Sequence, residues 1–259
     1  MTKALFFDID GTLVSFNTHA IPASTIEAIA KAKEKGIKVF ISTGRAKAII
    51  NNLGTLEFDG YITMNGAYCF AGKNEVIYKN SIPVQDVETM VSIVKKRKLT
   101  CIFVAEKKMM IANPNWMSDE FSVTLKTPIL PQVNPDQVLG MEIFQMSPFI
   151  TPAQERELMM QLPHCESGRW HPSFTDIVAV GSGKHNGIDA IIKHFDIRLD
   201  ETMAFGDGGN DISMLKHAAI GVAMGNAGEN VKQVADYVTD TVDKDGIMKA
   251  LKHFNVIDS

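Results

Sequence analysis

The sequence lacks the features that mark membrane, secreted and nucleic-acid-binding proteins. No uninterrupted apolar run approaches the roughly 18 residues of a membrane span, and Asp8 breaks the apolar stretch near the N-terminus, so we expect neither a membrane helix nor a signal peptide. The only cysteines are Cys69, Cys101 and Cys165, which are widely spaced and form no CxxC pair. They predict reduced thiols and a cytoplasmic location. The formal net charge is only −4, so we expect no nucleic-acid or membrane partner.

The composition is that of an ordinary globular protein. Hydrophobic residues make up 45% of the 259 residues and charged residues 22%, which argues against disorder. A chain of this length can form one large domain or two moderate ones with substantial cores. No internal repeat or low-complexity tract is visible, so repeat architectures are not expected.

Strand and helix patterns alternate in the first and last thirds of the chain. Short apolar runs of the kind that form buried strands are separated by helical patterns. This alternation predicts right-handed βαβ units and a mostly parallel sheet covered on both faces, which is an α/β fold. The expected strands are residues 4–7, 37–41, 61–64, 203–205, 220–223 and 237–238, and the expected helices lie between Pro22 and Gly36 and at residues 186–195, 211–218 and 229–235.

The middle of the chain has a different pattern. Two helices accompany several short strands, two of which can form a hairpin around residues 106–108. This order predicts an antiparallel sheet with two helices, an α+β unit inserted into the parallel domain. With Pro83 and residues 181–183 as hinges, the expected domains are residues 1–82 with 184–259, and the insert 83–183. The insert's expected helices are residues 84–98 and 152–161, and its expected strands are residues 101–105, 109–112, 141–146 and 174–180.

Two carboxylates follow the first expected strand. Asp8 and Asp10 lie within residues 8–12 (DIDGT), directly after the apolar run of residues 4–7. A carboxylate pair at the end of a buried strand suits the binding of a hard cation and attack on phosphorus. A simple Asp-Gly turn is the alternative interpretation.

Two further polar segments suit phosphate binding. Residues 42–45 (STGR) follow an expected strand, and their hydroxyl, glycine and backbone N–H groups suit a phosphate oxygen, although an ordinary helix N-cap explains them equally well. Lys184 opens an expected helix, where the helix dipole disfavours a cation. This placement favours a role in neutralising phosphate charge, and a solvated lysine is the alternative.

A second acidic segment, residues 206–211 (GDGGND), follows the expected strand 203–205. Polar side chains between glycines at the start of a helix fit Mg²⁺, which takes hard oxygen ligands and engages substrate phosphate. A turn with an N-cap is again the alternative. Because ligands of open parallel sheets bind outside the carboxyl ends of the strands, we expect the two acidic segments to form one site.

Together these segments resemble the four motifs of the haloacid dehalogenase (HAD) superfamily of phosphohydrolases. The matching residues are DIDGT at 8–12, Thr43 within TGR at 43–45, Lys184, and GDGGND at 206–211. The insert and MNGA at 64–67 resemble the Cof-type branch, with its α/β cap of the C2B type and its sugar- and hexose-phosphate phosphatases. His185 departs from the branch pattern, in which glycine commonly follows the lysine, and this affects only the expected loop shape.

The resemblance covers essentially the whole chain and implies a Rossmann-like parallel-sheet core domain with an inserted α+β cap domain. It assigns Asp8 as nucleophile and Asp10 as general acid and base. The implied Mg²⁺ ligands are Asp8, Asp10 and Asp207, the implied phosphate-binding residues are Thr43, Gly44, Lys184 and Asn210, and the implied orienting residues around them are Asp211 and Arg45.

The cap is expected to set substrate choice by closing over the phosphate and contacting the leaving group. An aromatic side chain can pack on a sugar face, and polar side chains can bind hydroxyls, although Trp170 is also a candidate for the cap core. The expected specificity residues are Arg169, Trp170, His171 and Asp176.

The resemblance therefore predicts a Mg²⁺-dependent phosphoric monoester hydrolase for small phosphorylated metabolites, with hexose phosphates favoured, that acts through an aspartyl-phosphate. A phosphomutase of the same superfamily and a non-catalytic phosphosugar-binding protein are the alternatives. A pure binding protein needs neither the nucleophile Asp8 nor the acid Asp10, which argues against the last alternative. We expect a monomer or a weak homodimer.

Overall fold

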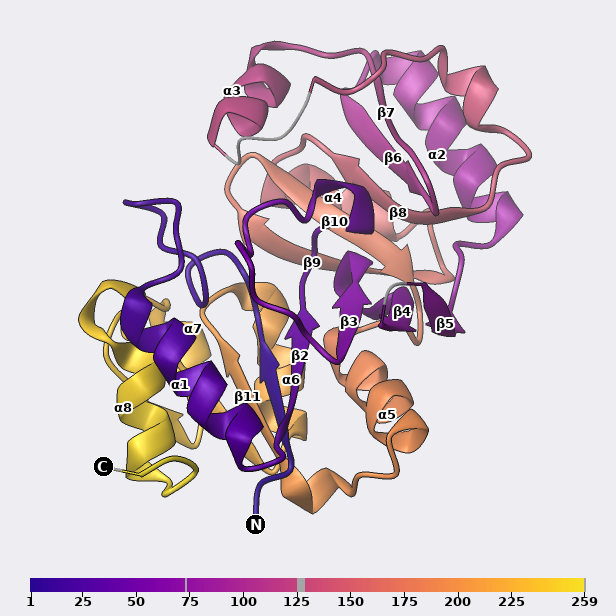
Figure 1. Ribbon diagram of the computed structural model, residues 1–259. Helices are drawn as coiled ribbons and strands as arrows, with labels where there is room; N and C mark the ends of the chain where they lie inside the picture. Colours follow the sequence, from indigo (N-terminus) through magenta and orange to yellow (C-terminus); the bar gives the residue numbers. More distant parts are fainter. Residues whose placement is uncertain (73, 125–128, 259) are drawn as a thin grey trace. The chain divides into compact units, whose positions relative to one another are not determined.

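The computed structural model describes residues 1–72, 74–124 and 129–258, and it divides into two compact units (Figure 1). The first unit comprises Met1–Thr43, Asn51–Lys79 and Gly183–Ser259, and the second comprises Gly44–Ile50 and Asn80–Ser182. Among the described residues, no helix combines the length and the apolar character needed to cross a membrane.

An eight-stranded sheet forms the centre of the first unit, in the order β13-β12-β11-β1-β2-β3-β4-β5. The strands from β13 to β3 run parallel, whereas β4 and β5 add an antiparallel edge. The strands are β1 (Ala4–Phe7), β2 (Lys38–Ser42), β3 (Gly60–Thr63), β4 (Tyr68–Ala71), β5 (Glu75–Lys79), β11 (Thr202–Gly206), β12 (Ile220–Ala223) and β13 (Tyr237–Val238).

Helices cover both faces of this sheet (Figure 1). The chain moves from β1 to β2 in one direction across the sheet and from β11 to β12 in the other, so right-handed crossovers place the connecting helices on opposite faces. One face packs Phe6 and Phe40, whose rings stack at 4.9 Å, under Ile188 and Ile191 of α5. The helices are α1 (Ala23–Glu34) with α8 (Gly246–His253), α5 (Lys184–His194) with α6 (Ile212–His217), and the short α7 (Glu229–Lys232).

The second unit is built on a five-stranded antiparallel sheet in the order β7-β6-β8-β10-β9. Its core packs α2 against this sheet through residues such as Val87, Met90, Phe103 and Ile177. The strands are β6 (Cys101–Ala105), β7 (Met109–Ala112), β8 (Ile143–Pro148), β9 (Cys165–His171) and β10 (Phe174–Ala179), and the helices are α2 (Val84–Arg97), α3 (Trp116–Thr124) and α4 (Pro152–Met159).

The expected α/β fold with a parallel-sheet core and an antiparallel insert is confirmed. The hairpin strands β6 and β7 have the expected bounds, and β8 lies two residues later than expected. The helix α5 begins at Lys184 rather than at residue 186. The strands β4, β5 and β9 and the helix α3 were not expected, and they complete the edges of the two sheets and the surface of the second unit.

Candidate active site

Lys184 is the first residue of α5, and its side chain is completely buried. Its ammonium donates to Asp8 Oδ1 at 2.8 Å, to the carbonyl oxygen of Ser42 at 2.8 Å and to Asp211 Oδ1 at 2.5 Å. An ammonium has three N–H donors, so these bonds satisfy it. Burial alone lowers the pKa of Lys184, yet the neighbouring Asp211 and Asp8 together raise it above its usual range. The buried side chain is therefore a permanent positive charge.

Asp8 lies directly after β1, and only 7% of its surface is exposed. Its backbone N–H donates to the carbonyl oxygen of Phe205 at 3.0 Å, which continues the pairing of β1 with β11 by one residue. Burial raises the pKa of Asp8 to about 7; Lys184 opposes this rise, and the charges of Asp211 and Asp10 add to it. The carboxylate is thus held at the carboxyl end of the sheet, beside a cation.

Asp207 follows β11, next to the end of β1. Both of its carboxylate oxygens accept hydrogen bonds, Oδ1 from Thr12 Oγ1 at 2.8 Å and Oδ2 from Asn226 Nδ2 at 3.3 Å. Burial and then the charges of Asp8 and Asp211 raise its pKa to about 8, and the Thr12 hydroxyl opposes the rise. The two hydrogen bonds therefore fix the orientation of the Asp207 carboxyl group. Its raised pKa favours the neutral acid near neutral pH unless a further cation binds beside it.

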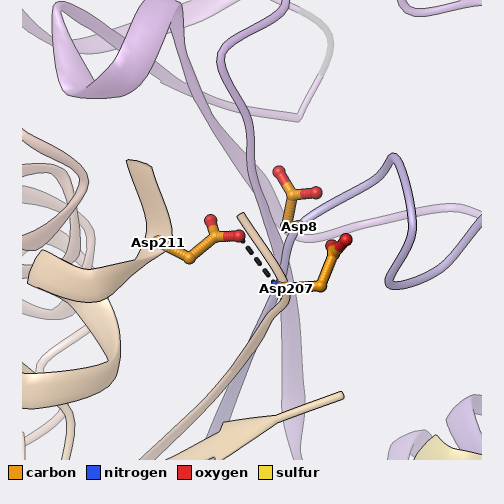
Figure 2. Close-up of side chains that lie close together, drawn as sticks. All are labelled: Asp8, Asp207 and Asp211. Carbon is orange, nitrogen blue, oxygen red and sulfur yellow. Dashed lines mark hydrogen bonds between the residues drawn. The ribbon is translucent and has the colours of Figure 1, made fainter. Parts of the chain in front are cut away.

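Asp211 closes the loop that carries Asp207, and it is fully buried. Its Oδ2 accepts the backbone N–H of Asp207 at 3.0 Å (Figure 2). The same oxygen accepts the N–H of Gly208 at 2.8 Å, while Oδ1 accepts from Lys184. A Cβ at Gly206 would lie 2.5 Å from the Asp211 Cβ, so glycine leaves the room that this packing needs. Both oxygens of Asp211 are thus used to shape the site.

The loop after β1 meets the loop after β11. Asp10 is half-buried, and its backbone forms an isolated β-bridge with that of Val14. Gly11 has a φ of +90°, and a Cβ there would lie 2.2 Å from Asp207 Oδ2. Glycine is needed at this position both for the left-handed backbone and for the close approach. The two acidic segments, which are far apart in the sequence, therefore lie together.

Thr43 and Asn210, both expected to bind phosphate, are linked through Asn65. Thr43 is buried just past β2, where its backbone N–H donates to the carbonyl oxygen of Ile62 at 2.8 Å. Its own carbonyl oxygen accepts the N–H of Asn65 at 3.1 Å. Asn210 Nδ2 donates to Asn65 Oδ1 at 3.0 Å. Three loops of the first unit are joined in this way.

Gly44 and Arg45 belong to the segment Gly44–Ile50, which groups with the second unit. Arg45 is buried, and its Nη1 donates to the carbonyl oxygen of Ile49 at 2.9 Å. The expected phosphate-binding segment is therefore divided between the units after Thr43.

Arg169 and Asp176 both make polar contacts inside the second unit. The Arg169 guanidinium forms a 2.7 Å ion pair with Glu155, and it also donates to the carbonyl oxygen of Ile150 at 2.9 Å. Asp176 is 3% exposed and accepts a 2.7 Å hydrogen bond from the Ser147 hydroxyl. These contacts fix β9 and β10 against their neighbours.

His171 ends β9, half-buried, with its ring stacked on Phe174 at 5.1 Å. Its Nδ1 accepts the backbone N–H of Ser173 at 3.2 Å, and burial lowers its pKa. An unprotonated imidazole at this position is a hydrogen-bonding group rather than a charge. The side chain of Trp170 lies outside the described part of the structure.

The donor set of the site fits a divalent cation. Asp8, Asp207 and Asp211 lie close together (Figure 2), and each places a carboxylate oxygen within 4.8 Å of the others. Among the described residues no other such group of histidine, cysteine or acidic side chains occurs. Lys184 supplies one buried ammonium beside this group of three acidic side chains, so full ionisation of the three would leave negative charge in excess. A hard cation with oxygen ligands would balance it, and Mg²⁺ is such a cation.

Three residues of the site did not enter the expected set. Thr12 and Asn226 hold the carboxylate of Asp207, and Asn65 links the loops of Thr43 and Asn210. Thr12 and Asn65 lie inside segments already noted for their resemblance, but they carried no assigned role. Asn226 follows β12 in a glycine-containing loop, which is the same signal of a polar residue at a strand's carboxyl end that identified the other segments.

Known structures and sequences agree with this architecture. A solved HAD subclass IIB sugar phosphatase, BT4131, is 57% identical, with a TM-score of 0.96 over 99% of this chain and 100% of that chain. The phosphatase BT1666 from Bacteroides thetaiotaomicron is 38% identical, with a TM-score of 0.92 over 99% and 96% of the two chains. The Bacillus subtilis (strain 168) protein named "Putative phosphatase YkrA" is 35% identical over 99% of both chains.

A Rossmann-like core with an antiparallel insert, shared over nearly the whole length with these phosphatases, defines a phosphoric monoester hydrolase. The model of the haloacid dehalogenase-like hydrolases matches residues 5–251, and the chain belongs to that family, in its Cof-type branch. The expected family, fold class and enzyme class are confirmed.

Proposed function

We propose that this phosphatase depends on Mg²⁺, that it hydrolyses sugar phosphates with hexose phosphates preferred, and that Asp8 is its nucleophile. The observation that carries the proposal is the arrangement around Lys184, whose ammonium lies 2.8 Å from Asp8 Oδ1 at the carboxyl end of the sheet. A carboxylate held beside a fixed cation suits attack on an anionic phosphate, and the two further carboxylates close by suit a divalent cation that would offset their negative charge.

The metal would be held by the side chains of Asp8 and Asp207 and by the backbone carbonyl of Asp10. The hydrogen bonds from Thr12 and Asn226 support this assignment, because they hold the Asp207 carboxylate in one orientation. When bound, Mg²⁺ supplies positive charge that offsets the repulsion between an anionic nucleophile and an anionic phosphate.

Asp8 would attack phosphorus, forming a bond from its carboxylate oxygen as the bond to the sugar oxygen breaks. Asp10 would give its proton to the departing sugar oxygen, which leaves as an alcohol. The same carboxylate would then take a proton from water as that water attacks phosphorus, which regenerates Asp8 and releases phosphate. The half-buried position of Asp10, two residues past Asp8, supports this division of roles.

The phosphoryl oxygens would be bound by Thr43, Gly44, Lys184 and Asn210. Lys184 supports this role through its buried positive charge; to bind a phosphoryl oxygen directly, its ammonium would exchange the hydrogen bond that it donates to Asp8. Such a charge stabilises a phosphoryl group most strongly where water is excluded. Asp211 would keep the ammonium in place, and Arg45 would support the loop that carries Gly44.

The insert, residues 83–183, would act as the cap that selects the sugar. Among its residues, Trp170 and His171 are the proposed contacts to the leaving group. The internal contacts of Arg169 and Asp176 favour a structural contribution from those two side chains. Support for a sugar substrate comes from the 57% identity with a protein described as a sugar phosphatase.

The test is a panel of phosphorylated sugars, nucleotides and vitamin phosphates, assayed with Mg²⁺ and ranked by kcat/KM, which measures discrimination directly. We expect hexose phosphates to rank first, free phosphate as the product, and no turnover after exhaustive EDTA treatment. A higher rank for nucleotides contradicts the substrate proposal. Turnover without metal contradicts the Mg²⁺ proposal, and isomerised sugar phosphate in place of free phosphate identifies a phosphomutase instead.

A further inference from the structure

The turn that follows β3 has an unusual backbone. Three successive residues of η2 (Met64–Gly66) have positive φ angles, 50° at Met64, 52° at Asn65 and 95° at Gly66. A left-handed conformation costs a residue with a Cβ free energy, and such residues persist where surrounding contacts hold them. Asparagine tolerates this conformation better than most residues, yet Met64 adopts it as well. The contacts of this turn therefore offset the free-energy cost of its left-handed backbone.

The contacts made by Asn65 are directed at two loops of the proposed phosphate site. Its backbone N–H donates to the carbonyl oxygen of Thr43 at 3.1 Å, and its Oδ1 accepts from Asn210 Nδ2 at 3.0 Å. Asn65 is 6% exposed, so both hydrogen bonds are shielded from water. The turn thus joins the residue after β2 to the loop after β11, neither of which is its neighbour in the sequence.

We propose that Asn65 is a positioning residue for phosphate binding, which fixes the side chain of Asn210 and the backbone at Thr43 in the geometry that receives the phosphoryl group. The inference rests on the proposed function, because Thr43 and Asn210 are phosphate ligands only under that proposal. Asn65 acts through these two residues. Its amide accepts one N–H of Asn210, which leaves the other N–H available to the phosphate.

Comparing glycine with alanine at position 65 separates the effect of losing the side-chain amide from the effect of backbone strain. Asn65→Gly removes the hydrogen bond to Asn210 but accepts the left-handed φ without strain, whereas Asn65→Ala removes the same bond and adds the strain. Asn255 offers a matched control, since it has a φ of 54° in the same unit and lies on an exposed turn after α8. Asn255→Gly and Asn255→Ala repeat the backbone change away from the proposed site.

The experiment measures the Kd for inorganic phosphate by calorimetry in saturating Mg²⁺, with the Tm of each variant. We expect Asn65→Gly and Asn65→Ala to raise this Kd by about three- to tenfold, the equivalent of one lost hydrogen bond, with a lower Tm for the alanine variant. Both Asn255 variants should bind phosphate like the wild type. An unchanged Kd in Asn65→Gly overturns the proposal.

A double-mutant cycle with Asn210→Ala completes the test. If Asn65 acts through Asn210, adding Asn65→Gly to Asn210→Ala should change the Kd by less than twofold. Full additivity of the two effects overturns the proposal even if each single variant binds phosphate weakly. The wild type is the check on the proposed function itself: if it neither binds inorganic phosphate nor hydrolyses p-nitrophenyl phosphate, the proposed function fails, and this is distinguishable from a failure confined to the Asn65 variants.

Discussion

The ammonium of Lys184 lies 2.8 Å from the Oδ1 carboxylate oxygen of Asp8, although the two residues are 176 positions apart in the chain. Lys184 also bonds Asp211, so one buried cation stabilises two buried carboxylates. Removing one partner of a buried ion pair leaves charge without compensation, which costs far more than the loss of an exposed pair. The cluster is therefore both a stability element and the centre of the site.

The first prediction concerns Lys184→Met. We expect it to lower the free energy of unfolding by about 3–5 kcal/mol at neutral pH in metal-free buffer, because Asp8 and Asp211 lose their cation. The loss should be smaller at acid pH, where protonation neutralises Asp8, whose pKa is raised to about 7. Urea unfolding measures it. Lys95→Met is the control, since Lys95 and Asp136 form a half-exposed pair worth less than about 1 kcal/mol. Equal losses of stability in the two variants would show that the buried cluster stabilises the fold no more than a half-exposed ion pair does.

The second prediction concerns Gly11→Ala, which places a Cβ 2.2 Å from Asp207 Oδ2. We expect the Asp207 carboxylate to be displaced and the Mg²⁺ affinity to fall by about tenfold or more. Gly36→Ala is the matched control, because Gly36 has a φ of +77° but no atom within 4 Å of the added Cβ. Both variants should lose stability from backbone strain, whereas only Gly11→Ala should lose Mg²⁺ affinity in a calorimetric titration. An unchanged affinity in Gly11→Ala would contradict the assignment of Asp207 as a ligand.

The third prediction links pH and metal. The folded-state pKa values of Asp8 and Asp207, about 7 and about 8, lie above the ordinary value of 3.8. Between about pH 4 and pH 8 the folded state therefore binds more protons than the unfolded state, so these groups make the metal-free protein less stable as the pH rises. Mg²⁺ binds the deprotonated carboxylates, so its stabilising effect should grow over the same range.

Thermal melts at about pH 5 and about pH 8, with Mg²⁺ or with EDTA, measure this effect. We expect the rise in Tm caused by Mg²⁺ to be larger at the higher pH, and Asp207→Asn to reduce the difference between the two conditions. An equal rise in Tm at both pH values would contradict the proposal that Mg²⁺ binds the deprotonated carboxylates of Asp8 and Asp207.

The fourth prediction concerns Asn226, whose Nδ2 donates to the carbonyl oxygen of Gly11 at 2.8 Å and to Asp207 Oδ2 at 3.3 Å. The orientation of its amide is fixed, because its Oδ1 accepts the backbone N–H of Val242 at 3.1 Å. We expect Asn226→Ala to weaken Mg²⁺ binding by about tenfold while turnover in saturating Mg²⁺ stays near normal. The exposed Asn230→Ala is the control and should bind Mg²⁺ normally. If Asn226→Ala binds Mg²⁺ with wild-type affinity, Asn226 does not position Asp207 for the metal.

The sequence predicts the centre of the fold better than its edges. The strands β1, β2 and β12 are short apolar runs followed by polar loops, and this pattern is specific enough to place them. By contrast, β9 contains Glu166, Ser167, Gly168 and Arg169 in sequence and has no apolar alternation. It is a strand because β10 pairs with it, and that pairing cannot be inferred from the local residues.

The sequence likewise predicts some residues of the site and misses others. Asp8, Asp207, Asp211 and Lys184 lie at strand ends or helix starts, and the structure brings them within contact distance, as expected for ligands of a parallel sheet. Asn226 also follows a strand, but its role depends on contacts with Gly11 and Val242, which are distant in the sequence or in another loop and cannot be inferred from the local residues.

The measurement that tests the central claim most directly is the fate of the phosphoryl group in Asp8→Asn, the fifth prediction. The wild type and the variant are mixed with p-nitrophenyl phosphate and Mg²⁺, quenched in acid during the first turnover and analysed by mass spectrometry. We expect one added phosphoryl group in the wild type, located on the peptide that contains Asp8. In Asp8→Asn we expect no such group, an intact fold and turnover lower by at least about a thousandfold. Near-normal turnover by Asp8→Asn, or a phosphoryl group on another residue of the wild type, would contradict the assignment of Asp8 as nucleophile.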